Sequence, residues 1–113
     1  MNILFVCSRN KKRSPTAETI FSGVKGIEVA SAGTAKDAEE QVTPEHLEWA
    51  NLIFVMESYH KVRLTEMYGR HLNGKRIVCL NIKDRFEYMD NELVALLRAR
   101  VTAVVAELVD AQA

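Results

Sequence analysis

Residues 3–15 are ILFVCSRNKKRSP, and this stretch decides the fold. Its first four residues form a continuous apolar run rich in strand-forming types, which predicts a strand buried on both faces. A polar and basic loop follows at residues 8–13. Ser14 then precedes Pro15, which predicts a helix with Ser14 as the N-cap and Pro15 in the first helical position. A strand that passes through a short loop into a helix is the first part of a βαβ unit.

The rest of the chain continues this alternation. Three further strands are expected at residues 27–30, 52–56 and 76–80. Helices are expected after a Thr43 cap, after a Ser58 cap to about Tyr68, and after a cap at Asp90 or Asn91. The last of these carries one apolar stripe, formed by Leu93, Leu96, Leu97, Val101, Val104, Val105 and Leu108. Alternating strands and helices predict an α/β fold with a parallel sheet.

Length and composition exclude several classes of protein. The chain has 113 residues, with 15 Lys plus Arg against 15 Asp plus Glu, and 48% are hydrophobic. That length suits one domain with its own core, and the apolar content argues against disorder. The balanced charge argues against a dedicated nucleic-acid binder. No apolar run approaches the roughly 18 residues of a membrane span, and the first residues lack a signal-peptide pattern, so we expect a cytoplasmic protein with no membrane partner.

Cysteine and histidine usage predicts neither disulfides nor a metal site. Cys7 and Cys79 are too few for a disulfide framework and lack metal-site spacing. The three histidines are scattered along the chain, at His46, His60 and His71.

Residues 7–14 fit the pattern C-x5-R-[ST] between the predicted strand and helix. Backbone N–H groups of a tight loop can surround an oxyanion, and the following helix directs its positive end to the same place. Arg13 can bind two phosphate oxygens with its planar fork. This positive field favours the thiolate form of Cys7, a nucleophile to which Ser14 could donate a hydrogen bond. The competing interpretation is a buried structural cysteine beside a solvated basic run, but the flanking strand and helix favour a catalytic loop.

On these motifs the chain resembles the low-molecular-weight protein tyrosine phosphatases. The similar stretches span most of the chain, and they are ILFVC (3–7), Asn10, RSPTAE (13–18), SAGT (31–34), ANLIFVME (50–57) and IKD (82–84). The resemblance implies a flavodoxin-like fold, a single three-layer domain over residues 1–113. Its four-stranded parallel sheet would have the order 2-1-3-4 and be flanked by helices.

The resemblance also implies a two-step mechanism without a cofactor. Cys7 would attack phosphorus and form a phosphocysteine, and Asp84 would be the general acid and later the base. Asp90 is the competing acid, although a helix-capping role is sufficient to explain it. The phosphate-binding residues would be Ser8, Arg9, Asn10, Lys11, Lys12, Arg13 and Ser14.

Four residues have expected roles in shaping or lining the site around this loop. Asn10 and Ser31 match family positions that shape the loop by hydrogen bonding. Phe86 and Tyr88 lie beside the acid in the sequence and could stack on an aryl phosphate as a wall of the site, or else pack between their loop and the last helix.

The chain departs from the family pattern in ways that leave its specificity open. Arg9 replaces the usual glycine, Lys11 and Lys12 replace an apolar residue and often a second cysteine, and Arg85 replaces a proline. The chain is also short between Thr34 and Val42, where the family builds a wall of its substrate cleft. The basic mouth favours multiply charged anionic substrates.

The leading hypothesis is therefore a protein tyrosine phosphatase acting on a phosphorylated protein or a small phosphomonoester. Alternatives are a phosphatase for nucleic-acid ends, which the neutral charge does not favour, and a non-catalytic phosphate-binding module. Arsenate reduction would need an external thiol, because Cys79 lies two strands from Cys7 in the family order, roughly 10 Å away. The expected state is a monomer or a weak homodimer through Tyr59 and Tyr68 on one helix.

Overall fold

A computed structural model describes residues 1–108, so the end of the expected domain, 109–113, lies outside the described residues. Four strands form one parallel sheet in the order β2-β1-β3-β4, which confirms the predicted fold. The strands are β1 (Asn2–Cys7), β2 (Glu28–Gly33), β3 (Leu52–Val55) and β4 (Arg76–Cys79). The helices are α1 (Arg13–Phe21), α2 (Pro44–Trp49), α3 (Ser58–Tyr68) and α4 (Asn91–Thr102), with a short 3-10 helix, η1 (Gly69–Leu72), after α3.

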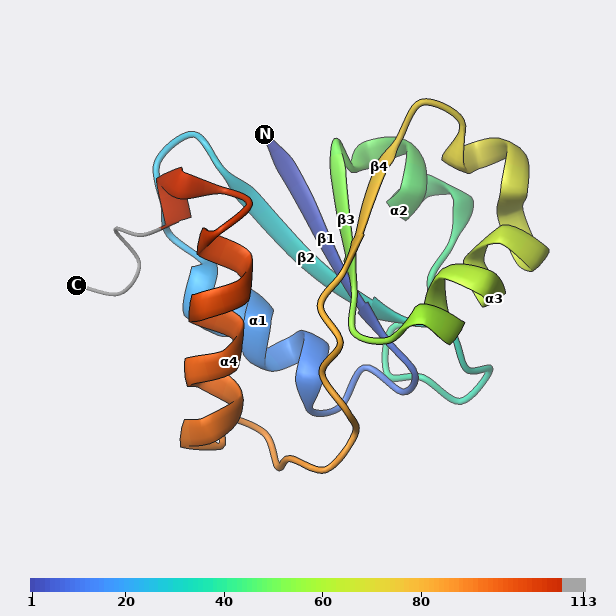
Figure 1. Ribbon diagram of the computed structural model, residues 1–113. Coiled ribbons are helices and arrows are strands. Elements are labelled where there is room, and N and C mark those ends of the chain that lie inside the picture. The colour runs from blue at the N-terminus through green and yellow to red at the C-terminus, as the bar shows by residue number, and fades with distance from the viewer. Residues whose placement is uncertain (109–113) are drawn as a thin grey trace.

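The helices cover both faces of the sheet and produce a three-layer arrangement (Figure 1). Helices α1 and α4 lie on one face, and α2 and α3 lie on the other. Side chains of β1 alternate between the two cores: Ile3, Phe5 and Cys7 face the first, and Leu4 and Val6 face the second. Burial of each such apolar side chain stabilises the fold by about 1.5–3 kcal/mol. The position of β1 is therefore fixed from both sides.

The strand order places a ligand site at the carboxyl end of β1. The chain passes from β1 to β2 on one side of it and then crosses to β3 on the other. Ligands of open α/β sheets bind where the direction of winding changes in this way. The residues that follow Cys7 occupy that position.

None of the helices within residues 1–108 has the length and apolar character that a membrane span requires.

Two of the predicted helix caps are wrong. Helix α1 begins at Arg13 with Lys12 as its N-cap, so Ser14 lies inside the first turn. Helix α3 begins at Ser58 with Glu57 as its N-cap, and the Glu57 backbone N–H donates to Nδ1 of His60 at 3.0 Å. The Ser14 side chain does not cap its helix because it makes tertiary contacts with the site described below.

The last helix has the predicted start but not the predicted length. The Asp90 carboxylate accepts a hydrogen bond from the Glu92 backbone N–H at 2.8 Å, as expected of a cap. The helix ends at Thr102, although Val105 and Leu108 are still buried against the core. The β-branched residues that gather around Thr102 are poor helix formers, and packing on the core does not require them to be helical.

Candidate active site

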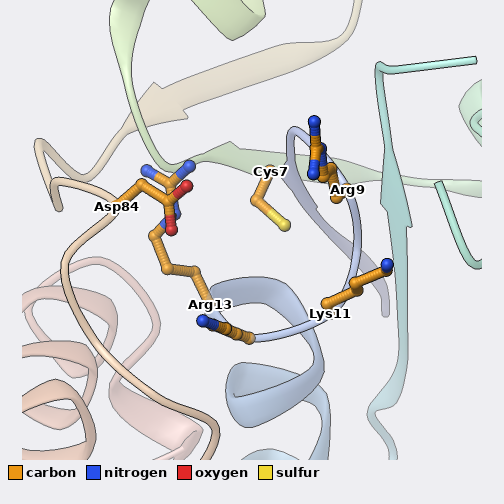
Figure 2. A pocket seen from close by; sticks show the side chains of 6 residues that line it. Cys7, Arg9, Lys11, Arg13 and Asp84 are labelled. Atoms are coloured by element: carbon orange, nitrogen blue, oxygen red, sulfur yellow. The ribbon is translucent and has the colours of Figure 1, made fainter. Parts of the chain in front are cut away.

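A cavity of about 250 Å³ opens at the carboxyl end of β1 (Figure 2). Cys7 lies in its wall, and the other lining residues are Arg9, Lys11, Lys12, Arg13 and Asp84. Five of these six belong to the C-x5-R loop. Asp84 comes from the segment between β4 and α4, so the fold brings the expected nucleophile, cation and acid to one cavity.

The Cys7 sulfur has two hydrogen-bond contacts. Oγ of Ser14 lies 2.9 Å from Sγ, and the Asn10 backbone N–H donates to Sγ at 3.3 Å. Cys7 is buried except for the part that faces the cavity. Both contacts can stabilise negative charge on sulfur, either before an attack or when sulfur leaves.

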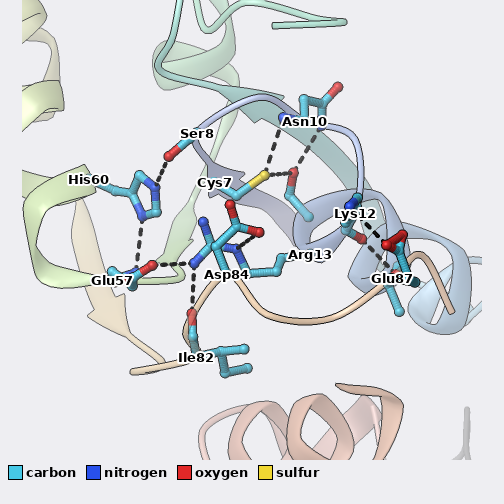
Figure 3. A network of polar contacts seen from close by, with 12 residues as sticks. Cys7, Ser8, Asn10, Lys12, Arg13, Glu57, His60, Ile82, Asp84 and Glu87 are labelled. Carbon is cyan, nitrogen blue, oxygen red and sulfur yellow. Dashed lines mark hydrogen bonds and ion pairs between the residues drawn. The ribbon is translucent and has the colours of Figure 1, made fainter. Parts of the chain in front are cut away.

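A buried polar network shapes the loop around this cysteine (Figure 3). Asn10 has a left-handed backbone with φ of 57°, a conformation that asparagine tolerates better than most residues. Its side-chain amide donates to Oγ of Ser14 and to Oγ of Ser31, both at 2.9 Å. The Ser31 hydroxyl in turn donates to Glu18 at 2.5 Å. The predicted supports, Asn10 and Ser31, are in direct contact, and Glu18 extends the network.

Arg13 is 2% exposed and is held by several acceptors. Its Nη1 donates to the Glu57 carboxylate at 2.5 Å and to the Ile82 carbonyl at 2.7 Å. Its Nε lies 3.7 Å from the Asp84 carboxylate. Burial alone would lower the pKa of Arg13, but hydrogen bonding to Glu57 and Tyr59 and the charge of Asp84 raise it above its ordinary value. The guanidinium is therefore charged and oriented.

A second network holds the start of the loop from helix α3. Oγ of Ser8 lies 2.9 Å from Nε2 of His60 and 2.6 Å from the Tyr59 hydroxyl. Nδ1 of His60 accepts a hydrogen bond from the Glu57 backbone N–H. The ring proton of the imidazole therefore resides on Nε2 and is donated to Ser8. Burial, followed by the charge of Arg13, lowers the pKa of His60 to about 4, so this imidazole is neutral near pH 7.

Sequence reasoning assigned Glu57, Tyr59 and His60 no role in this site. Their signal was present, since Glu57 and His60 stand three residues apart directly after a buried strand. In a parallel sheet the carboxyl ends of neighbouring strands share one edge, so residues after β3 meet residues after β1. The pair could have been placed beside Ser8 on that argument.

The basic residues of the loop differ in how they are paired. Lys12 lies 3.1 Å from Glu87, and Arg9 lies 3.8 Å from Asp37 with both side chains 65% exposed. Lys11 is exposed at the cavity and makes no ion pair within residues 1–108. The mouth is thus basic, as predicted, but most of its cations face a carboxylate.

The two predicted aromatic wall residues do not line the cavity. Phe86 is 6% exposed and packs in the core beside α4, because its apolar ring is more stable there than in water. Tyr88 is half exposed, and its hydroxyl lies 2.8 Å from Oγ1 of Thr19 on α1. The aromatic side chain that contacts the loop is instead Tyr59, through Ser8.

The two candidate acids are in different places. Asp84 lines the cavity and is largely exposed to solvent, whereas Asp90 caps α4 and is absent from the lining. The geometry agrees with the preference for Asp84.

The short segment after β2 lies directly against the loop. Backbone N–H groups of Thr34, Ala35 and Glu39 donate to the carbonyls of Cys7, Ser8 and Arg9 at 2.9–3.0 Å. Gly33 permits this approach, since a Cβ built there would lie 2.4 Å from the Ser8 carbonyl oxygen. This segment therefore supports the loop.

Sequence comparison gives one family and two curated relatives. Residues 2–51 match the family model of low molecular weight phosphotyrosine protein phosphatases. A protein-arginine-phosphatase of Geobacillus stearothermophilus is 30% identical over 90 residues, which cover 58% of this chain and 61% of the relative. A protein of the same name from Bacillus subtilis (strain 168) is 28% identical over 98 residues, covering 63% and 65%. Both matches thus span less than two-thirds of the relatives' lengths.

Structural comparison extends the similarity to nearly the whole chain. The YwlE arginine phosphatase of G. stearothermophilus has a TM-score of 0.72 at 24% identity and covers 96% of both chains. The low molecular weight protein tyrosine phosphatase SP-PTP of Streptococcus pyogenes has a TM-score of 0.76 at 19% identity and covers 95% of this chain and 92% of that one. At these identities the structures establish a common fold. The resemblance drawn from the motifs is confirmed as far as these matches reach: residues 2–51 match the family model of the low molecular weight phosphotyrosine protein phosphatases, and the chain shares the fold of these phosphatases.

Proposed function

We propose that this chain is a cysteine-dependent phosphomonoester hydrolase that removes phosphate from phosphotyrosine in proteins through a phosphocysteine intermediate. The observation that supports this most strongly is the convergence at one small cavity of the Cys7 sulfur, the Arg13 guanidinium and the Asp84 carboxylate. The family of the matched model and the fold agree with this assignment.

In the first step, the loop and Arg13 bind the phosphoryl oxygens, and the Cys7 thiolate attacks phosphorus. The S–P bond forms while the bond from phosphorus to the leaving oxygen breaks. Asp84 in its acid form donates a proton to that oxygen. Arg13, already charged and fixed by Glu57, stabilises the charge on the transferring group without reorganisation.

In the second step, a water molecule attacks the phosphocysteine. The Asp84 carboxylate accepts the proton of this water, the S–P bond breaks, and inorganic phosphate is released. The electron pair returns to the Cys7 sulfur, where the Ser14 hydroxyl at 2.9 Å stabilises the leaving thiolate.

Phosphoarginine is the second candidate substrate, because both curated relatives are named protein-arginine-phosphatases.

Arsenate reduction through an internal disulfide is less well supported. Cys79 pairs with Val55 of β3, which itself pairs with Val6 of β1, so Cys79 and Cys7 are two strands apart. Two strand spacings are roughly 10 Å, beyond the reach of a direct disulfide.

The test is hydrolysis of an activated aryl phosphate by wild type and by Cys7→Ser, in metal-free buffer with and without vanadate. The proposal expects activity that vanishes in the variant and is blocked by vanadate. A folded wild type that cleaves neither an aryl phosphate nor a phosphoarginine peptide would instead be a phosphate-binding module.

A further inference from the structure

We infer that Lys11 forms a second anion site at the rim of the cavity, which selects phosphotyrosine substrates that carry an acidic residue beside the phosphorylated one. This inference rests on the proposed function and adds the class of substrate sequence that the site accepts.

The pairing of charges around the cavity singles out Lys11. Arg13 has Glu57 and Asp84 as partners, and Lys12 has Glu87 at 3.1 Å. Arg9 has only a long contact to Asp37, and a pair so exposed contributes little to stability. Lys11 has no ion pair within the part of the chain that the structure describes, although it lines the cavity. Its ammonium group is therefore free to bind an anion brought by the substrate.

The direction of the substrate brings such an anion to Lys11. Figure 2 shows Arg9 and Lys11 on the opposite side of Cys7 from Asp84. The leaving oxygen must approach Asp84, and the peptide attached to it then lies across the mouth of the cavity, which Lys11 lines on the other side. Neighbouring residues of an extended peptide are about 3.4 Å apart along the chain, a step within the swing of a lysine side chain. A carboxylate next to the phosphotyrosine can thus contact Lys11.

The surrounding carboxylates limit what else can bind. Asp37, Asp84 and Glu87 stand beside the three cations Arg9, Arg13 and Lys12 at the mouth, and they repel an extended polyanion such as a nucleic-acid end. One local negative charge beside the scissile phosphate fits the arrangement better than an extended polyanion does.

The experiment compares phosphotyrosine peptides of equal length, flanked by Asp and Glu or by Asn and Gln. The leaving group is identical, so differences in kcat/KM report recognition. Wild type is expected to prefer the acidic peptide about two- to fivefold at low salt, and the preference should shrink as salt screens the contact. Lys11→Gln should bring the ratio close to one, mainly through KM, and Lys11→Arg should restore it. Lys25→Gln, in the exposed segment before β2 at the amino ends of the strands, should keep the wild-type ratio.

Binding of both peptides to Cys7→Ser separates this inference from the proposed function. If no peptide is hydrolysed but Cys7→Ser binds the acidic one more tightly, and adding Lys11→Gln removes the difference, the anion site stands without the activity. Hydrolysis with equal kcat/KM for both peptides would overturn the inference and leave the activity in place. A ratio that persists in Lys11→Gln would overturn it too, as would faster cleavage of a phosphoarginine peptide or a 5′-phosphorylated oligonucleotide.

Discussion

The Glu57 carboxylate fixes the Arg13 guanidinium, with Oε1 2.5 Å from Nη1. The Ile82 carbonyl accepts from the same nitrogen at 2.7 Å. Both contacts use Nη1, so the other edge of the planar fork is the one that a phosphoryl group can meet. Glu57 does not line the cavity, and its role is to position the arginine.

Replacing Glu57 with Gln tests this positioning role. Loss of a hydrogen bond between charged groups costs about 1.5–3 kcal/mol, so kcat/KM is expected to fall about ten- to a hundredfold. Inhibition by vanadate and by phosphate should weaken in parallel, because both need an oriented Arg13. The matched control is Glu66→Gln in α3, the helix that follows Glu57, and this change removes only an exposed pair with Arg63. Unchanged phosphate inhibition in Glu57→Gln would contradict the assignment.

The general acid can be identified by comparing two variants. Asp84→Asn should slow hydrolysis, and substrates with poor leaving groups should lose most, about a hundredfold or more, because they depend on a proton donor. Asp90→Asn should retain activity, since asparagine also caps a helix well. The measurement is the rate at which each variant hydrolyses a series of phenyl phosphates that range from good to poor leaving groups. A steeper dependence on the leaving group in Asp90→Asn than in Asp84→Asn would reverse the assignment.

Gly33 provides a test of loop geometry that involves no reactive group. A Cβ at this position would lie 2.4 Å from the Ser8 carbonyl oxygen and 2.7 Å from Cβ of Ala38. Gly33→Ala should therefore displace the loop and reduce kcat/KM together with the melting temperature. The control is Gly69→Ala, where the backbone is helical and no atom lies within 4 Å of the new Cβ. That variant is expected to be as stable as wild type or more so. Equal activity of Gly33→Ala and wild type would mean that the loop tolerates the shift.

The fold and the nucleophile loop could be predicted because their signals are local. An apolar run, a basic loop and a helix start lie within residues 3–15, and a parallel sheet then follows from the alternation of elements. The supports of the loop are tertiary contacts, and a local pattern does not reveal them. Glu57 and His60 meet the loop only because β3 lies beside β1.

The wrong details have a common physical cause. Ser14 has the residue type of a helix cap, but its hydroxyl contacts Cys7 and Asn10 instead. Phe86 stands next to the acid in sequence, but its ring enters the core. In both cases a tertiary partner outweighed the local preference of the residue. The sequence could not indicate this, because the partners are distant in the chain or are chosen by the geometry of the loop.

Burial of His60 should make the stability of the fold depend on pH. Its pKa is lowered from 6.5 to about 4 in the folded protein, mainly by burial and then by Arg13, with the carboxylates of Glu57 and Asp84 acting in the opposite direction. The unfolded chain therefore binds a proton more readily between these two values. The stability that depends on a neutral His60 is fully present above pH 6.5 and is lost as the pH falls towards 4. This loss in the free energy of unfolding is on the order of 3 kcal/mol.

The measurement is urea unfolding of wild type and His60→Gln at several pH values from 7.5 to 4. Carboxylates titrate in both proteins, so the difference between them isolates the histidine. At pH 7.5 the variant should be the less stable, because glutamine reproduces the contacts to Ser8 and Glu57 only in part. The difference in unfolding free energy between the two proteins should narrow as the pH falls, because only wild type loses the stability that a neutral, buried imidazole provides. A gap that stays constant over this range would mean that His60 titrates alike in the folded and unfolded chains.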